Sequence, residues 1–366
     1  MAKDPFITRQ LSPWLDLIRA MAAFAVLAGH SVQQGLYSGP WPFTIALQQN
    51  AVIVFFVLSG LVIATSVDRK AMRLRDYALA RLVRILPVAL PALAISVAVA
   101  AIGQSQGVSG GEVAPAANAL VGDGLLPAMF FLSESYRTGL WINPPYWSLC
   151  YEVWFYAIFA AATFLKDVKR LAWVVLLAVL AGPNILLLLP IWLLGVWLAR
   201  SRKARILSVE QARIRIAMAL VLLLAQRFLA EPLLSLLVTV ARWNLAYSQY
   251  ALSYFALGVG VALGITGLRK LVEEGQLDIS RFARPISFAA NMSFSLYLLH
   301  WPLIAALRIA HVSAGRDVFG FAGLLLLICA ACALFATVGE HRRHQLRSMI
   351  ERILPHHLRH AQQAGS

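Results

Sequence analysis

The sequence predicts an all-α, polytopic membrane protein with about ten transmembrane helices. Of its 366 residues, 60% are hydrophobic and only 13% are charged, and the mean hydropathy is +0.71. Soluble domains contain about 45–50% apolar residues, so this composition indicates a membrane protein. The apolar runs are continuous and approach the roughly 20 residues that a helix needs to cross a bilayer. They lack the alternation of apolar and polar residues that is typical of a membrane β-barrel.

Ten apolar runs are the candidate spans, and the stretch at 171–199 is the hardest to interpret. The sequence Ala-Gly-Pro-Asn at 181–184 divides it and favours a turn between two short helices, although one long kinked helix would also fit. The predicted spans are residues 12–34, 44–66, 83–103, 146–165, 171–183, 184–199, 214–230, 250–268, 287–310 and 318–338.

Lysines and arginines predict which loops face the cytoplasm, because short cytoplasmic loops carry an excess of them. With the N-terminus inside, the inner segments hold 26 of the 32 basic residues and the outer segments hold three. This distribution places both termini in the cytoplasm, makes 171–199 a hairpin and leaves 119–132 outside as a re-entrant or interfacial piece. We expect one multi-pass domain, residues 1–366, in the inner (cytoplasmic) membrane, with a basic cytoplasmic tail at 339–366.

The net charge of +15 is explained by this topology and by attraction to anionic lipid, so no nucleic-acid partner is expected. The first span carries Asp16 and Arg19 and is too long for a secretory signal, which predicts a retained helix. The cysteines Cys150, Cys329 and Cys332 fall within spans. In an apolar helix the C-x-x-C sequence is more typical of packing than of metal or redox chemistry, and no metal site is predicted.

Ionisable residues within or beside the bilayer are the candidates for function, because such residues are expensive there. In the first span, Arg19 and His30 are eleven residues apart and therefore share a helix face, separated by roughly 16 Å along the axis. A snorkelling arginine and a hydrogen-bonded core histidine would explain them equally well. Arg81 and Arg84 lie one turn apart at the inner surface, where two guanidinium groups make a phosphate clamp. The general excess of basic residues on that side also explains either arginine alone.

The stretch "WSLCYEVWFY", residues 147–156, places a glutamate in an aromatic, apolar run. Ser148 and Glu152 are four residues apart and share a helix face near its outer end. We expect Glu152 to pair with His30, which lies at a similar depth, and to orient that ring as a general base for a hydroxyl group. The alternative is that Glu152 neutralises an arginine for packing alone.

A polar stripe marks the late apolar run "SFSLYLLHWPL". Ser293, Tyr297 and His300 recur at the spacing of one helix face, and Pro302 follows them. Taken alone, such a stripe is more often a hydrogen-bonded contact between helices than a catalytic site.

Five motifs occur along the chain in a fixed order. They are Arg-x10-His in the first span, "FFVLSG" in the second, Arg-x-x-Arg before the third, "YWSLxxE" midway and "SLYLxHWP" near the end. In this order they resemble the acyltransferase-3 family of integral membrane acyltransferases, and the resemblance covers nearly the whole chain.

The resemblance implies transfer of an acyl group, usually acetyl, from cytoplasmic acyl-CoA to a hydroxyl of a carbohydrate or glycolipid. It makes His30 the essential catalytic histidine with Arg19 and Glu152, assigns CoA handling to Arg81 and Arg84, and places Ser148, Tyr297 and His300 in the substrate site. Acyl-CoA is then a co-substrate, no cofactor is implied, and the other partners are the acceptor and the lipid bilayer.

The sequence departs from the family pattern in two respects. The closing Glu-x-Pro-x-Arg pattern appears without its proline as "GEHRRH", residues 339–344, so Glu340 is assigned no role. We expect a stand-alone type of enzyme, without the extracytoplasmic hydrolase-like domain that some family members carry after the last span.

A proton-coupled exporter of a lipid-linked sugar is the alternative function, because such transporters use in-membrane Arg, His and Glu in proton relays. The absence of an internal repeat and the paired inner arginines disfavour it. A structural scaffold is disfavoured further, since it gives no reason to keep so many ionisable groups in the membrane.

Overall fold

The computed structural model describes residues 5–43, 46–106, 124–135, 140, 142–202, 204, 206–241, 245–339 and 348. These residues form helices and loops without a strand, which confirms the all-α fold class. The long helices are α1 (Ser12–Gln33), α2 (Ala46–Lys70), α3 (Leu74–Ser105), α6 (Trp147–Phe164), α7 (Asp167–Arg200), α8 (Val209–Ala241), α9 (Ala251–Glu273), α10 (Ala283–Ile309) and α11 (Val318–Gly339). The short ones are α5 (Leu125–Met129), η2 (Pro144–Tyr146), η3 (Ala246–Tyr250) and η4 (Ser280–Phe282).

Seven helices of the described chain are long and apolar enough to cross a membrane, namely α1, α2, α3, α7, α9, α10 and α11. The bent α8 adds an eighth if its two parts form one span. The predicted count of ten is therefore not confirmed, although the multi-pass character is. Within the segment 119–132, residues 119–123 lie outside the described chain. The rest contains only the five-residue α5, which is too short to cross a bilayer.

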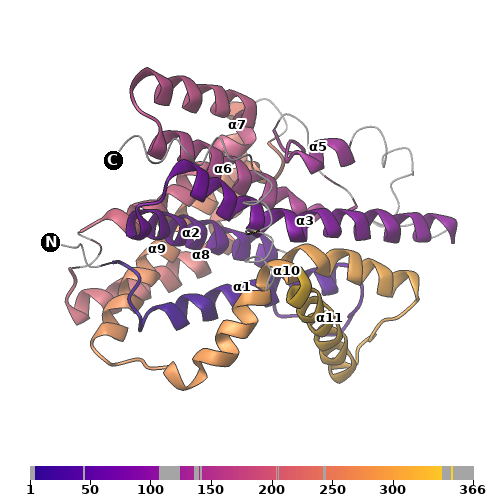
Figure 1. Ribbon diagram of the computed structural model, residues 1–366. Helices are drawn as coiled ribbons and strands as arrows, with labels where there is room; N and C mark the ends of the chain where they lie inside the picture. The colour runs from indigo at the N-terminus through magenta and orange to yellow at the C-terminus, as the bar shows by residue number, and fades with distance from the viewer. Residues whose placement is uncertain are drawn as a thin grey trace.

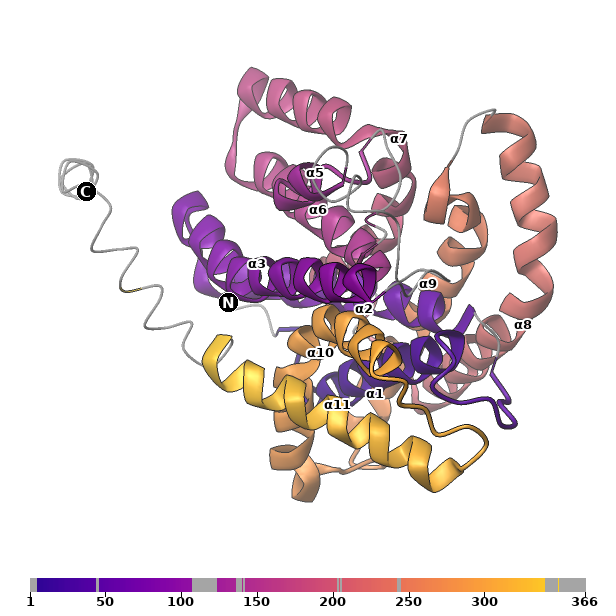
Figure 2. The ribbon, with the colours of Figure 1, turned by 90° about the vertical axis from the view of Figure 1, so that its right-hand side faces the viewer.

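The helices pack around α1, α2 and α10 (Figures 1 and 2). Helix α1 lies between α2 and α10, while α10 also contacts α3 and α11. On the other side, α2 packs against α7 and α9, and α9 packs closely on α8. This arrangement places the motif-bearing faces of α1, α2, α6 and α10 in the interior.

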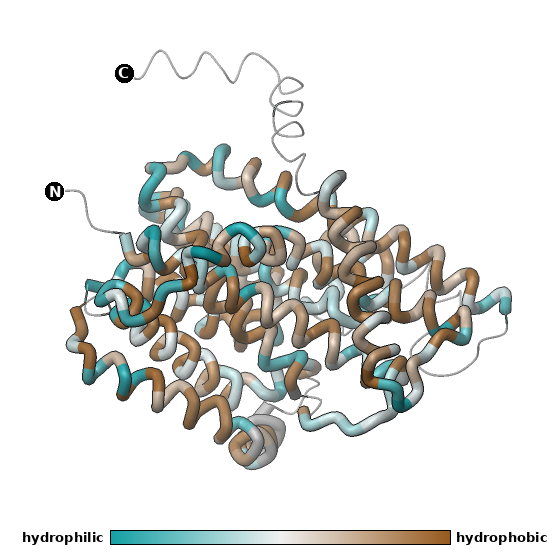
Figure 3. The backbone as a smooth tube through the Cα atoms, turned by 90° about the horizontal axis from the view of Figure 1, so that it is seen from below, coloured by the Kyte–Doolittle hydropathy of each residue, from teal (hydrophilic) through white to brown (hydrophobic). Residues whose placement is uncertain are grey.

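Much of the tube in Figure 3 is hydrophobic, and its hydrophilic segments gather near the loops. Large apolar side chains are exposed along α11, where Phe319 is 85% and Leu334 71% accessible. The first half of α7 is similar, with Val168 80% and Leu171 66% accessible. Soluble proteins rarely expose apolar surface of this extent, so these helices face lipid.

Hydrogen bonds between loops define two ends of the bundle. At one end, the α1–α2 and α10–α11 loops meet, because Ser38 N donates to Gly315 O over 2.7 Å and Ala314 N donates to Leu36 O over 2.9 Å. At the other end, Arg200 forms a bidentate contact with Asp68. Loops predicted to share a side of the membrane therefore lie together. Which end faces the cytoplasm remains a prediction.

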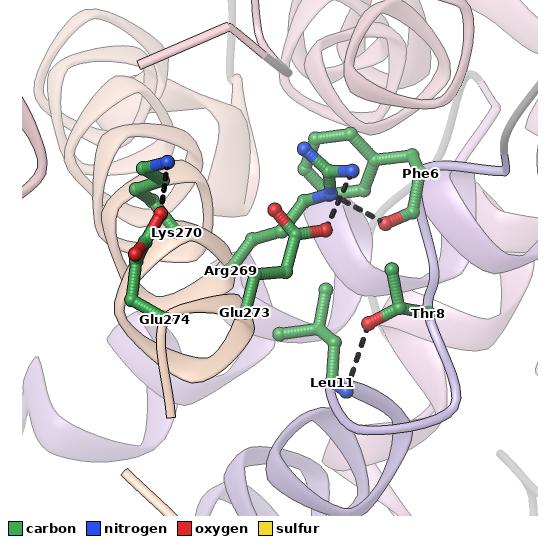
Figure 4. Close-up of polar contacts among 7 residues, drawn as sticks. All are labelled: Phe6, Thr8, Leu11, Arg269, Lys270, Glu273 and Glu274. Atoms are coloured by element: carbon green, nitrogen blue, oxygen red, sulfur yellow. Dashed lines mark hydrogen bonds and ion pairs between the residues drawn. The ribbon is translucent and has the colours of Figure 1, made fainter. Parts of the chain in front are cut away.

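The segment before α1 contacts the end of α9 at the same end of the bundle as Asp68 and Arg200 (Figure 4). Arg269 is 6% exposed, and its Nε donates to the Phe6 carbonyl oxygen over 3.0 Å. The guanidinium also lies over the Phe6 ring and forms a 2.7 Å ion pair with Glu273. The described part of the N-terminal segment, residues 5–11, and the end of α9, both predicted to be inner, are thus in contact.

Helix α7 turns back on itself at Gly182, whose φ of 82° and ψ of 168° interrupt the helix. Helix α7 starts just after Phe164 of α6, whose ring centroid lies 5.4 Å from that of Tyr77. At the other end of α7, the Arg200 guanidinium lies over the ring of Phe159, which also belongs to α6. A straight helix of this length would separate its ends by about 50 Å. Both ends therefore lie at the same end of the bundle, as the hairpin reading of 171–199 requires.

The motif "FFVLSG" ends in a glycine that allows α2 and α7 to touch backbone to backbone. A Cβ atom on Gly60 would lie 2.1 Å from the Trp192 carbonyl oxygen, and one on Gly195 would lie 2.0 Å from that of Val57. Small residues permit such close helix contacts in membranes. The motif is thus partly explained by packing.

Candidate active site

A cavity of about 80 Å³ lies at the end of the bundle where the α1–α2 and α10–α11 loops meet. It is many times larger than the roughly 10–15 Å³ that one water molecule needs. The lining residues come from the ends of α1, α2 and η2, and from α6, α10 and η3. They are His30, Gln33, Gln48, Gln49, Val52, Pro144, Pro145, Trp147, Tyr247, Tyr297 and Trp301.

His30 and His300 contact each other beside this cavity, although they are 270 residues apart in sequence. His30 Nδ1 lies 2.8 Å from His300 Nε2, and the two rings are nearly parallel with centroids 5.1 Å apart. The Trp301 ring meets the His30 ring edge-on at 5.2 Å. Because α1 and α10 pack along each other, the first and last motifs form one unit.

The hydrogen bonds of this pair determine which nitrogens carry hydrogen. His300 Nδ1 lies 2.9 Å from the Leu296 carbonyl oxygen, which accepts only, so His300 Nδ1 is the donor. In a pair of neutral rings, His300 Nε2 must then accept from His30 Nδ1. The remaining nitrogen, His30 Nε2, keeps its lone pair on a ring that lines the cavity. This is the arrangement that a general base needs.

Ser148 and Tyr297 join α6 to α10 one helical turn away from the histidine pair. The Tyr297 hydroxyl donates to the Pro145 carbonyl oxygen over 3.0 Å and lies 2.7 Å from Ser148 Oγ. Since that hydroxyl has a single hydrogen, Ser148 donates to Tyr297. Tyr297 lines the cavity, whereas Ser293 bonds back to the Ala290 carbonyl oxygen of its own helix.

Glu152 lies further along α6, and its predicted pairing with His30 does not form. Among the described residues, its carboxylate interacts with the Tyr156 hydroxyl one turn away. Tyr156 also contacts Ser59 Oγ at 3.1 Å, and Trp192 Nε1 donates to that Ser59 atom over 3.2 Å. Donation therefore runs from Trp192 through Ser59 and Tyr156 to the carboxylate. His30 needs a hydrogen-bond acceptor at Nδ1, and His300 rather than Glu152 provides it. The reason is that α10, and not α6, packs on α1.

The two arginines of α3 lie beside this polar row. The Arg81 guanidinium lies over the rings of Tyr77 and Tyr156, at 5.8 Å and 5.7 Å from their centroids. Its Nε is buried without a hydrogen-bond partner among the described residues. The Arg84 guanidinium lies over the Phe294 ring at 5.1 Å. These contacts hold two cations in the interior, where unpaired charge is costly.

Arg19 is not brought to the cavity. It forms a 2.9 Å ion pair with Asp16 one turn earlier on α1, and both side chains are 28% exposed. Its predicted distance from His30 along the helix, roughly 16 Å, places it near the opposite end of the bundle.

The predicted residues form a row that leads inward from the cavity. Helix α10 contributes three residues to this row, which follow one another over about 9 Å of the helix axis. They are Phe294, whose ring lies under Arg84, then Tyr297 and then His300. Along α6, Ser148, Glu152 and Tyr156 follow in parallel, and Glu152 interacts electrostatically with Tyr297 as well as with Tyr156. Each of the five motifs therefore contributes at least one residue to one continuous interior region.

Sequence reasoning missed the cavity's glutamines and the role of Tyr247. Gln33, Gln48 and Gln49 line the cavity, and Tyr247 stacks on Trp147 at 4.4 Å. The polar run Gln-Gln-Asn at 48–50, at the start of an otherwise apolar span, was the available signal. Tyr247 carries no such signal, because its position depends on η3 reaching α6.

The acyltransferase domain family matches residues 12–338. No characterised protein and no solved structure matches the chain. Because the family match covers most of the 366 residues and includes all five motifs, the chain belongs to the acyltransferase-3 family and is a membrane acyltransferase.

Proposed function

We propose that this acyltransferase moves an acyl group, in the first instance acetyl, from acyl-CoA to a hydroxyl group of a carbohydrate or glycolipid. The observation that carries the proposal is the His30–His300 pair at a cavity, with an imidazole lone pair left on His30 Nε2. Acceptor and donor approach this nitrogen from opposite directions, the acceptor through the cavity and the thioester along the interior row.

The donor end of the row is assigned to Arg81 and Arg84. CoA carries several phosphate groups, and guanidinium groups bind phosphate through paired donors. Arg81 keeps Nε without a partner among the described residues, which leaves a donor for such a ligand. The end of the bundle that carries these arginines is then the cytoplasmic end, in agreement with the distribution of basic residues.

In the proposed reaction His30 Nε2 takes the proton of the acceptor hydroxyl as its oxygen attacks the thioester carbonyl carbon. The carbon–sulfur bond then breaks, and the proton passes from His30 to the CoA thiolate. The products are an ester and CoA with a free thiol. His300 is a positioning residue that holds the required tautomer of His30. Glu152 accepts a hydrogen bond from Tyr156 and so fixes the direction of donation along the chain from Trp192 and Ser59.

Glu152 favours a cation in the row, because its half-buried carboxylate lies on a largely aromatic helix and interacts with Tyr156, Tyr77 and Tyr297. Arg81 acts on two of the same tyrosines. The opposite charges of Glu152 and Arg81 therefore partly offset the cost of holding each of them in the interior.

Thiol release from acetyl-CoA by the purified protein in lipid nanodiscs tests the proposal. We expect His30→Ala to lower the rate at least about 100-fold, since a positioned base contributes roughly 10²–10⁴-fold. His311→Asn is the control, because His311 is an exposed loop histidine with φ of 56° and asparagine tolerates that conformation. An exporter would release no thiol, and a His30→Ala enzyme with the wild-type rate would exclude His30 as the base.

A covalent acyl-histidine intermediate is the variant of this mechanism. Incubating the protein with radiolabelled acetyl-CoA in the absence of acceptor distinguishes the two routes. Label retained on the wild-type chain and absent from His30→Ala indicates the covalent route. A wild-type chain that retains no label, yet transfers label once an acceptor is added, indicates direct attack.

A further inference from the structure

Gln48 leaves hydrogen-bonding capacity unused at the cavity. Its side chain is 4% exposed, it lines the cavity, and its Nε2 donates to Gln33 Oε1 over 3.4 Å. Its Oε1 is buried and has no hydrogen-bond partner among the described residues. A buried carbonyl oxygen without a partner is costly, so a ligand that donates to it gains more than it would in water.

The backbone of α1 is shaped to accept this side chain beside the catalytic histidine. A Cβ atom on Gly29 would lie 2.5 Å from Gln48 Cδ and 2.9 Å from its Nε2. Gly29 directly precedes His30, so the amide packs against the turn that carries the base. A group held by Gln48 is therefore held next to His30.

The other described lining residues point to the chemical class of that group. None is an aspartate, glutamate, lysine or arginine. Bringing a charged group into such a site would remove its hydration without supplying a counter-charge. Three glutamine amides supply donors and acceptors, and the rings of Trp147, Tyr247 and Trp301 supply apolar faces. This combination suits an uncharged group with several hydroxyls.

We propose that Gln48 Oε1 accepts a hydrogen bond from a hydroxyl of an uncharged sugar unit and so presents a neighbouring hydroxyl to His30. The cavity then selects neutral over anionic sugars. This inference deepens the proposed function and relies on it for the identity of the cavity as the acceptor site.

Binding of methyl glycosides to the protein in nanodiscs tests the inference without requiring catalysis. Methyl β-glucoside, methyl β-galactoside and methyl β-glucuronide are titrated while tryptophan fluorescence is followed, because Trp147 and Trp301 line the cavity. Nanodiscs avoid glycosidic detergents, which would compete. Thiol release from acetyl-CoA is measured on the same samples.

Two variants weaken the proposed contact in different ways. Gln48→Leu removes the amide, while Gly29→Ala keeps it and displaces it. We expect each to weaken binding of the neutral glycosides about tenfold, the loss of one hydrogen bond to a buried group, and to raise the KM for the sugar more than that for acetyl-CoA. Gln226→Leu is the matched control, because Gln226 is likewise buried, at 3% exposed, and has an Oε1 without a partner among the described residues, but lies away from the cavity in α8.

Preference for the neutral glycosides, lost in Gln48→Leu and Gly29→Ala and kept in Gln226→Leu, supports the inference. It is overturned if no neutral glycoside binds, if the glucuronide binds as well as the glucoside, if Gln48→Leu binds like the wild type, or if Gln226→Leu weakens binding equally. A wild-type protein that binds the glycosides but releases no thiol would contradict the proposed reaction alone.

Discussion

At the residue scale, the site depends on the order of donors and acceptors in a chain of hydrogen bonds. The Leu296 carbonyl oxygen fixes His300 Nδ1 as a donor, and this leaves His30 Nε2 as the basic nitrogen. The ring that fixes the orientation of His30 is thus itself fixed by a backbone carbonyl group. His300 is fully buried, so its contribution is positional and is tested through His30.

We predict that His300→Phe lowers kcat at least about tenfold, because His30 loses the acceptor that selects its tautomer. His300→Gln should recover part of the activity, since its carbonyl oxygen can accept from His30 Nδ1. Steady-state thiol release with both variants checks this. Equal activity of the Phe and Gln variants would show that His300 contributes packing alone.

The two buried glutamines near the cavity should respond differently to loss of the amide. Gln48→Leu removes an unpartnered carbonyl oxygen, so we expect unchanged or higher stability, by up to about 1–3 kcal/mol. Gln34→Leu removes the acceptor of a 2.6 Å hydrogen bond from Arg308 and should destabilise the fold by a similar amount. Thermal unfolding in one detergent compares them, and a Gln48→Leu variant as unstable as Gln34→Leu would contradict this account.

At the element scale, close helix contacts determine where the interior row can form. The Gly60 and Gly195 contact lets α7 approach α2 until Trp192 reaches Ser59. That contact begins the donor chain that ends at Glu152. A packing residue in one motif therefore helps to position the Glu152 carboxylate in another.

Gly60→Ala should destabilise the protein by about 1–3 kcal/mol, because the added atom would lie 2.1 Å from backbone, which no rotamer change relieves. Gly323→Ala is the same substitution in α11, where nothing lies within 4 Å of the new Cβ atom, and we expect no loss of stability. Thermal unfolding and thiol release of both variants test the pair. Equal unfolding temperatures and equal rates of thiol release for the two variants would show that α2 and α7 can move apart without loss of stability or activity.

At the scale of the whole molecule, the bundle has one end with the cavity and another end with the arginine-rich loops. The contacts of Phe6 with Arg269 and of Asp68 with Arg200 both lie at the second end. The loop contact of Ser38 with Gly315 lies at the first. A transfer reaction between opposite sides of a membrane needs this polarity.

We predict that Lys166→Cys and Arg202→Cys, which flank α7, react with a membrane-impermeant thiol reagent from the cytoplasmic side. Ser313→Cys, in the α10–α11 loop, should react from the opposite side. Labelling of intact and of permeabilised cells, in a background without the native cysteines, distinguishes the sides. Labelling of positions 166 and 202 from opposite sides would contradict the reversal at Gly182.

The helical architecture could be predicted from hydropathy, and the site only in part. Spans such as α1 and α10 follow from apolar runs, because a backbone in lipid must form its own hydrogen bonds. The count was less certain, because α6 carries polar residues and α8 bends. His30, Tyr297 and His300 are predicted as polar members of apolar helices; His30 and Tyr297 line the cavity and His300 contacts His30. Arg19 was also predicted and lies elsewhere, paired with Asp16.

The sequence by itself determined that this chain is a multi-pass helical protein and which family it resembles, because composition, apolar run length and motif order are properties of a linear chain. Only the tertiary structure decided that His300 rather than Glu152 contacts His30, and that Gln48 meets Gly29 at the cavity. Those pairings depend on which helices are neighbours and how they are rotated. In a bundle this choice is made by close packing between distant segments, such as Gly60 against α7, and no local pattern encodes it.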